Sequence, residues 1–429
     1  MPKNIFFKST LILLIGGFFT KILGLIIKII FTRILKEPGI ALYSLIMPTY
    51  SLLISLANFN IQLSISKRIS SNKRSKKTII NACYIMLVLN IILISTTLLS
   101  SKFISINLLK NKSTLLPLIA CSLTLPFISI GYIIKGYFYG RQNVKPHMIS
   151  NVLEQTFRLI IISFLLPKIA KYGIVITVTS LILFNILSES FSIFIFMFFL
   201  PKHFKIKKED LNFEIGETKE LLSTSIPSIS GRLICNIGYF FEPILLTNIL
   251  LSQGLNANYI ATEYGIYNAY AVSTLLFPSF FISAISNSLL PEISRLRSEN
   301  NIKLVKKRIK ESLIISCIIG IICTLLIYIF KDTIMLKLYN TTKGINYIKI
   351  LAPFFILFYL ESPLSSILIA LNKVKTSTFI SISGMLVKLI TMTILAFLNF
   401  KIYSLVIAEI INIIYVTLLN YIHVKRSFK

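Results

Sequence analysis

Long apolar stretches separated by short polar segments follow one another along the whole chain. Each stretch reaches the length of about 20 residues that a helix needs to cross a bilayer. The pattern predicts twelve membrane-spanning helices, at 9–33, 40–66, 78–100, 114–135, 147–167, 173–200, 219–248, 264–290, 310–330, 346–371, 377–398 and 402–424. The sequence therefore predicts an all-α, polytopic membrane protein.

The first apolar stretch carries two lysines well inside it, Lys21 and Lys28. Each charge at such a position costs roughly 2.5–3.5 kcal/mol on insertion scales. At 100° per residue, both lysines share an arc of about 120° with small and hydroxylated residues. This face consists of Gly17, Thr20, Lys21, Gly24, Lys28 and Thr32. It must meet water or an anion, while the remaining Leu, Ile and Phe face lipid or protein.

Three further predicted spans have a polar face of their own. On the second these are Ser44, Ser51, Ser55, Asn58, Gln62 and Ser66; on the seventh Ser225, Ser228, Arg232, Asn236 and Tyr239; on the eighth Asn268, Ser279, Ser283 and Ser286. Ser and Asn also join helices to each other, so alone they leave open whether such a face binds a ligand. Lys21, Lys28 and Arg232 favour a watery cavity, because a buried cation needs a partner or water.

Composition agrees with a membrane protein and explains the net charge. Of the 429 residues 55% are hydrophobic and 14% charged, whereas about a quarter are charged in a soluble domain. The net charge of +29 comes largely from lysines in short loops, which is the positive-inside pattern rather than a nucleic-acid surface. Alternate loops carry 28 and 11 basic residues, which predicts a cell-membrane protein with both termini cytoplasmic. We expect the first span to remain uncleaved.

The two halves of the chain resemble each other. Gly39-Ile-Ala-Leu-Tyr43 opens the second span and Gly265-Ile-Tyr267 opens the eighth. At an offset of 230 residues, 140–146 matches 370–376, and Arg158 falls opposite Lys388. Six spans per repeat start both halves on the same side of the membrane. This predicts two six-helix lobes, 1–205 and 206–429, related by a pseudo-twofold along the membrane normal, with a site between them near midplane.

Isolated charges also fall in spans of the second half, namely Glu242, Glu361, Glu409 and Lys388. Because such charges are expensive in a membrane, we expect Lys388 to lie near Glu242 or Glu409. The pair could hold the lobe together or couple transport to sodium or protons, and the sequence leaves both open.

Enzyme chemistry has little support in the sequence. Five cysteines lie in predicted spans without metal or redox spacing, and three histidines are scattered in loops. No carboxylate or histidine cluster of a membrane-embedded transferase or hydrolase occurs. We therefore expect no catalytic residue, no cofactor and no metal. A structural scaffold for a cell-wall complex remains an alternative, although a duplicated polar cavity would then serve nothing.

Several segments resemble the polysaccharide-transport branch of the MOP exporter superfamily. They are Lys21-Ile-Leu-Gly24 through Arg33, then Gly39, Tyr43, Pro48 and Tyr50; Lys135-Gly-Tyr-Phe-Tyr-Gly140 with Pro146, Glu154, Gln155 and Arg158; and Tyr264-Gly265 with 288–294. Within this branch, the match is closest to the stage V sporulation protein B-like flippases, which move lipid-linked oligosaccharides. The resemblance implies two lobes around a central cavity, a rocking cycle of alternating access, and an undecaprenyl-diphosphate-linked saccharide as cargo. Many members have fourteen spans, so twelve would leave out a lipid groove formed by the last pair.

The leading hypothesis is thus a flippase for a lipid-linked oligosaccharide diphosphate. We expect Lys21, Lys28, Arg232, Asn58, Gln62 and Asn236 to bind this substrate. The expected partners are the cargo, membrane lipids and a coupling sodium ion or proton, but no nucleic acid, and the protein is expected to be a monomer. The alternative is a multidrug or cation antiporter of the related branch, which needs acidic residues where these faces carry cations.

Overall fold

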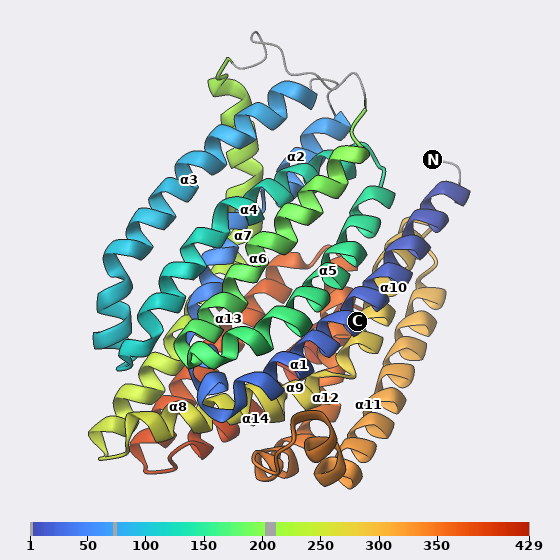
Figure 1. Cartoon of the computed structure of the whole chain (residues 1–429). Coiled ribbons are helices and arrows are strands. Elements are labelled where there is room, and N and C mark those ends of the chain that lie inside the picture. Colours follow the sequence, from blue (N-terminus) through green and yellow to red (C-terminus); the bar gives the residue numbers. More distant parts are fainter. Residues whose placement is uncertain (1–2, 72–74, 202–211, 429) are drawn as a thin grey trace. The chain divides into compact units, whose positions relative to one another are not determined.

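All regular elements that the structure describes are helices, as predicted (Figure 1). The computed structural model describes residues 3–71, 75–201 and 212–428, with side chains from residue 15 onward apart from residue 75. The first half contains α1 (Lys3–Asn58), α2 (Ile61–Ser71), α3 (Ser75–Phe103), α4 (Leu115–Gly140), α5 (Lys145–Ile169) and α6 (Ile174–Phe198). The second contains α7 (Ile215–Ser252), α8 (Ala257–Gly265), α9 (Ser273–Leu276), α10 (Ser279–Ser298), α11 (Ile302–Tyr339), α12 (Ile345–Ala370), α13 (Val374–Phe397) and α14 (Tyr403–Arg426).

The helices agree with the predicted spans. In the described part of the chain, nine helices are long and apolar enough to cross a membrane, and the bent pair 257–276 and 279–298 makes a tenth. The first predicted span and most of the second lie in α1, whose 56 residues would measure about 84 Å as one straight helix, more than twice the apolar thickness of a bilayer. The protein is therefore a multi-pass, all-α membrane protein.

A break at Lys36 separates the two spans within α1. Lys36 has φ 53° and ψ −170°, which is not helical. Pro38 follows two residues later and cannot donate a hydrogen bond to the carbonyl of Ile34, so the helix is weakest at this point. The backbone of α1 thus bends where the sequence predicts a loop between spans.

The second and the eighth span are each interrupted near their middle. In the second, Phe59 and Asn60 have φ of 45° and 51° and separate α1 from α2. In the eighth, α8 runs into a π-helical segment, Ile266–Val272, then α9, and a 53° bend lies at Phe277 and Pro278. Pro278 lacks the backbone N–H that would continue the helix. Two equivalent spans are therefore broken, one in each half.

The chain forms two compact units, Met1–Asn236 and Ile237–Lys429, which divide within α7. The predicted lobe boundary at 205/206 falls in 202–211, outside the described residues, and remains a prediction. The first half of α7 belongs to the first unit because its side chains bond to α1 and α2, as for Asn236 with Ser55 and Ser225 with Ser64. Arg232 therefore belongs to the first compact unit.

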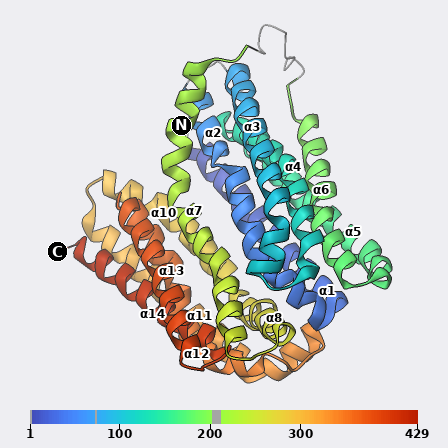
Figure 2. The same cartoon turned by 90° about the vertical axis from the view of Figure 1, so that its left-hand side faces the viewer.

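The same pattern of helix contacts occurs in both units. In the first, α4 packs against α2, α3 and α6, and α5 packs against α6. In the second, α12 packs against α10, α11 and α14, and α13 packs against α14. Figure 2 shows α2, α3 and α4 adjacent in the first unit. This agreement supports the internal duplication predicted from the sequence.

Small residues allow α4 to approach α2 closely in the first unit. A Cβ added at Gly136 would lie 2.9 Å from Cβ of Ile65, and one at Gly140 would lie 2.7 Å from Cβ of Ile69. Two glycines four residues apart therefore form the contact face, as in many membrane helix pairs. The surrounding core also contains Tyr137 and Phe138. The second unit has a corresponding aliphatic core at the ends of α10, α11, α12 and α14.

Candidate functional site

The cationic face predicted for the first span lies on α1, and open space borders it within the first unit. Lys21 is exposed and Lys28 half-buried. A Cβ added at Gly17 or Gly24 would meet no atom within 4 Å, whereas one at Gly16 would lie within van der Waals overlap of Met148. The lysines are seven residues apart on one helix, so their Cα atoms are about 10.5 Å apart.

Positions of α1 next to the cationic face are packed into the unit. Ile27 and Phe31 are both 6% exposed, and α1 packs along α5. Thr32 is fully buried and donates its hydroxyl to the carbonyl of Ile29, so it belongs to the packed part of the helix. The open polar face therefore extends from Gly17 to Lys28 and does not include Thr32.

The other predicted binding residues of the first unit lie near the break between α1 and α2 or on α7. Arg232 is exposed on α7, and one turn later Asn236 donates its amide to the hydroxyl of Ser55 on α1. Asn58 and Gln62 lie on either side of the break, and the Asn58 side-chain oxygen is buried without a hydrogen-bond partner. The structure thus brings Asn236 to the polar face of the second span.

A cluster of ion pairs, absent from the sequence-based prediction, joins α2 to the start of α7. Arg68 donates from Nε and Nη2 to Glu217 at 2.7–3.1 Å and also pairs with Glu220. Thr78 donates to the same Glu217 carboxylate at 2.6 Å. The hydrogen bond that Arg68 donates to Glu217 raises the pKa of Arg68 above its ordinary value. Nothing in the sequence links residues so far apart, although both lie in polar segments next to spans.

One turn before Arg68 on α2 and two turns after Glu217 on α7, the hydroxyls of Ser64 and Ser225 lie 2.7 Å apart and are buried. Together with the Arg68 cluster, this contact fixes the first half of α7 against α2.

The buried cation of α5 is paired inside the first unit. Arg158 donates to Glu154 at 2.9 Å and to the Ser188 hydroxyl at 2.9 and 3.0 Å. Glu154 is therefore engaged on its own helix. Glu189, on α6, lies with Lys135 beside Gly131.

At the position that the repeat equates with Arg158, Lys388 of α13 has two carboxylates around it. Its ammonium lies 2.6 Å from Glu242 and 2.7 Å from Glu409, and the Tyr264 hydroxyl donates to Glu242 at 3.0 Å. The three charged side chains are 12%, 1% and 14% exposed. The structure thus brings Lys388 to both carboxylates named from the sequence, while Glu361 contacts Thr417 instead.

Comparison with known families agrees with this architecture. A family model described as polysaccharide biosynthesis protein matches residues 6–297, and the MatE model matches residues 267–394. The chain belongs to the polysaccharide biosynthesis protein family. It is therefore a member of the MOP superfamily of transporters.

Curated relatives and solved structures support this membership. Stage V sporulation protein B of Bacillus subtilis is 30% identical over 399 residues, covering 90% of this chain and 77% of that protein. Lipid II flippase MurJ of the same organism is 23% identical, covering 89% of this chain and 76% of that protein. An inward-facing multidrug resistance MATE family transporter has the same fold, with a TM-score of 0.76, 14% identity and coverage of 95% and 94% of the two chains.

The environment of Lys388 predicts that removing its charge lowers the stability of the protein much more than removing an exposed charge. Lys388→Gln leaves two buried carboxylates without their cation, and breaking a buried pair costs about 3–5 kcal/mol. We expect the midpoint of thermal unfolding in detergent to fall by several degrees. Glu242→Gln should cost less, because the pair of Lys388 with Glu409 remains.

Lys307→Gln is the matched control, since Lys307 and Glu311 form an exposed pair with atoms 4.0 Å apart. Its unfolding temperature should stay near that of the wild type. Equal unfolding temperatures for Lys388→Gln and Lys307→Gln would contradict a structural role of the ion pair. An intact Glu242→Gln variant whose transport no longer responds to an ion gradient would indicate coupling instead.

Proposed function

We propose that this protein is a flippase that moves an undecaprenyl-diphosphate-linked saccharide across the cell membrane by alternating access. The observation that carries the proposal is the cationic face of α1, where two lysines lie within a membrane span beside glycines that border open space. A diphosphate is an anion that such a face can stabilise. Family membership supports the transport of a precursor in polysaccharide synthesis.

In this proposal Lys21, Lys28 and Arg232 bind the diphosphate. A separation of about 10.5 Å between the Cα atoms of the lysines suits a diphosphate and its first sugar, or successive positions of the headgroup. Arg232 can bind phosphate through two parallel N–H groups, which a lysine cannot. We assign Asn58, Gln62 and Asn236 to the same site as neutral hydrogen-bonding groups. A ligand that contacts these groups differently in two conformations shifts the balance between them.

The orientation and energetics follow from charge. We propose that both termini lie in the cytoplasm, because the positive-inside rule assigns the more basic set of loops to that side. We propose that the protein is a monomer. The Lys388 ammonium, held by Glu242 and Glu409, then stabilises the second unit. Coupling of transport to sodium or protons at these carboxylates is the alternative role. No residue is assigned a catalytic role.

A multidrug or cation antiporter is the second candidate function, because the fold is that of MATE transporters. Such a carrier needs anionic groups around its substrate, whereas the polar faces of α1 and of the first half of α7 carry Lys21, Lys28 and Arg232. This charge favours the anionic cargo.

Substitution of the cationic residues tests the assignment. Lys28→Ala and Arg232→Ala should each abolish translocation of the lipid-linked saccharide in proteoliposomes that contain equal amounts of protein. Lys28→Arg should retain much of the activity, since it keeps the charge. The measurement is the fraction of cargo that becomes accessible to a membrane-impermeant glycosidase.

Lys102→Ala is the control, because Lys102 is exposed at the end of α3 and outside this face. It should translocate at the wild-type rate. Wild-type activity in the double variant Lys28→Ala, Arg232→Ala would remove the cationic site from the proposal.

In this proposal α7 moves with the second predicted lobe, 206–429, so the start of α7 separates from α2 in each cycle. Since the Ser64 and Ser225 hydroxyls are 2.7 Å apart, the pair Ser64→Cys, Ser225→Cys should form a disulfide in a background without native cysteines. Oxidation should stop translocation, and dithiothreitol should restore it.

The chain offers a closely matched control within one helix bundle. The hydroxyls of Ser150 and Ser192, on α5 and α6, are also buried and 2.7 Å apart. A disulfide in Ser150→Cys, Ser192→Cys should leave translocation unchanged. Undiminished transport by the oxidised Ser64–Ser225 pair would contradict a cycle that opens this contact.

A further inference from the structure

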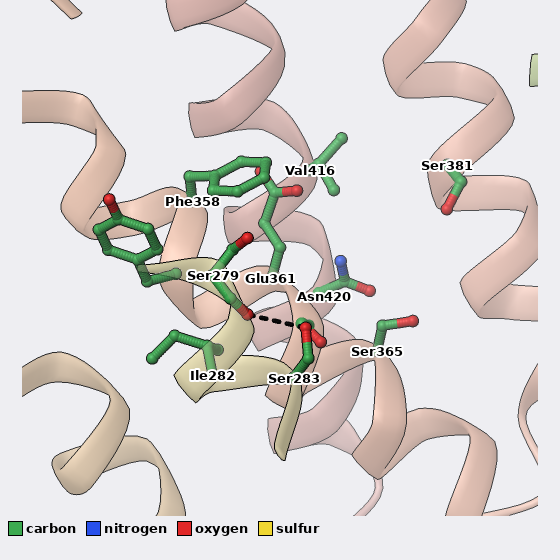
Figure 3. A pocket seen from close by; sticks show the side chains of 11 residues that line it. Ser279, Ile282, Ser283, Phe358, Glu361, Ser365, Ser381, Val416 and Asn420 are labelled. Atoms are coloured by element: carbon green, nitrogen blue, oxygen red, sulfur yellow. Dashed lines mark hydrogen bonds between the residues drawn. The ribbon is translucent and has the colours of Figure 1, made fainter. Parts of the chain in front are cut away.

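The second unit contains a cavity of about 330 Å³ that the cationic site does not explain. It lies among α10, α12, α13 and α14, and Figure 3 shows its lining. The polar groups that matter most are Glu361 and Asn420, with the serines of α10 and α12 around them. Two of these serines, Ser279 and Ser283, belong to the polar face predicted for the eighth span, and they follow directly after its bend.

Five hydroxyl groups of the lining donate their hydrogen to other atoms of the protein. Ser279 donates to the carbonyl of Leu276, Ser283 to that of Ser279, and Ser381 to that of Ser377. The Tyr359 hydroxyl donates to the carbonyl of Leu275, and Ser362 donates to Ser286. A hydroxyl has one hydrogen and two lone pairs, so what these groups still offer is acceptors.

Glu361 and Asn420 add two further acceptors to the lining. Asn420 is 3% exposed, and its side-chain oxygen has no hydrogen-bond partner. Glu361 has no ion pair among the described residues; its contact is a 3.5 Å approach of the Thr417 hydroxyl, which also donates to the carbonyl of Leu357. Lys388, the buried lysine of this unit, is held by Glu242 and Glu409. A buried acceptor without a hydrogen bond costs free energy, so the cavity favours a ligand with many hydrogen-bond donors.

The size and the lining of the cavity indicate which kind of donor-rich ligand it can bind. The volume corresponds to roughly ten water molecules and to the lower end of organic ligand pockets, which is far more than one bare ion fills. No group of three metal-binding side chains occurs in the described part of the chain. Ile282, Phe358 and Val416 add apolar surface beside the acceptors. A sugar ring combines an apolar C–H face with several hydroxyl or amide donors.

We propose that this cavity is a subsite for one sugar unit of the saccharide cargo, with Glu361 and Asn420 accepting hydrogen bonds from its hydroxyl or amide groups. The inference rests on the proposed function and extends it, because it names residues of the second unit that recognise the glycan. One carboxylate among many neutral acceptors suits an uncharged sugar better than an organic cation.

The test compares two lipids that differ only in the sugar. Full-length protein in nanodiscs is titrated with undecaprenyl diphosphate and with undecaprenyl-diphosphate-linked N-acetylglucosamine, and the ratio of the two Kd values is measured. The wild type should prefer the glycan-bearing lipid about tenfold or more. Asn420→Leu should reduce that preference about three- to tenfold, the effect of one neutral hydrogen bond, and Glu361→Gln should reduce it at least as much. Neither variant should change the Kd of bare undecaprenyl diphosphate.

Asn412→Leu is the matched control, since Asn412 lies two turns earlier on α14, near Gly384, and does not line the cavity. Its preference should equal that of the wild type. If Asn420→Leu does not fold, Ser362→Ala with Ser365→Ala removes two acceptors and gives the same comparison.

Equal affinity for both lipids, or an unchanged preference in the cavity variants, would overturn the subsite while leaving the proposed function intact. Binding of neither lipid would overturn both, and Glu361-dependent binding of tetraphenylphosphonium without a glycan preference would assign the cavity to organic cations.

Discussion

A charge inside a membrane protein must be compensated by an opposite charge, by hydrogen bonds or by water, and the interior of this chain follows that constraint. Arg158 is met by Glu154 and Ser188, and Lys388 by Glu242 and Glu409. These two cations occupy equivalent positions of the repeat and are engaged by their own unit. Lys21 and Lys28 lie on a face of α1 that borders open space at Gly17 and Gly24, and this face is the one proposed to receive a ligand.

Breaks in the backbone lie close to the polar faces. Pro38 and Pro278 remove hydrogen-bond donors, and Phe59 with Asn60 adopts a left-handed conformation. Irregular backbone at membrane depth is tolerated where it is buried in protein or lines a cavity. The bend at Pro278 directly precedes the serines of the acceptor-rich cavity, and the break after Asn58 precedes Gln62. Paired broken spans in the two halves of a transporter are a recognised sign of the binding region.

Local signals were enough to predict much of the fold. Hydropathy alone located the spans, and the offset of 230 residues predicted that Arg158 and Lys388 would be equivalent. Long-range pairings could not be predicted in the same way, since the contact of Arg68 with Glu217 joins residues 149 apart in sequence. The interruption of the second span at Phe59 was missed, because an apolar residue followed by Asn carries no strong break signal. The unsatisfied oxygen of Asn420 depends on the packing of four helices, which periodicity does not contain.

In the proposed function the glycine- and lysine-bearing face of α1 contacts the cargo diphosphate. The most direct measurement is site-specific photo-crosslinking in native membranes, with a benzoylphenylalanine at position 24 or at position 26 and a radiolabelled lipid-linked saccharide. Gly24 lies on the cationic face beside open space, and Ile26 is exposed on a different side of the same helix. We expect the radiolabelled cargo to crosslink to the protein from position 24 and not from position 26. Equal labelling from both positions, or labelling from position 26 alone, would contradict it.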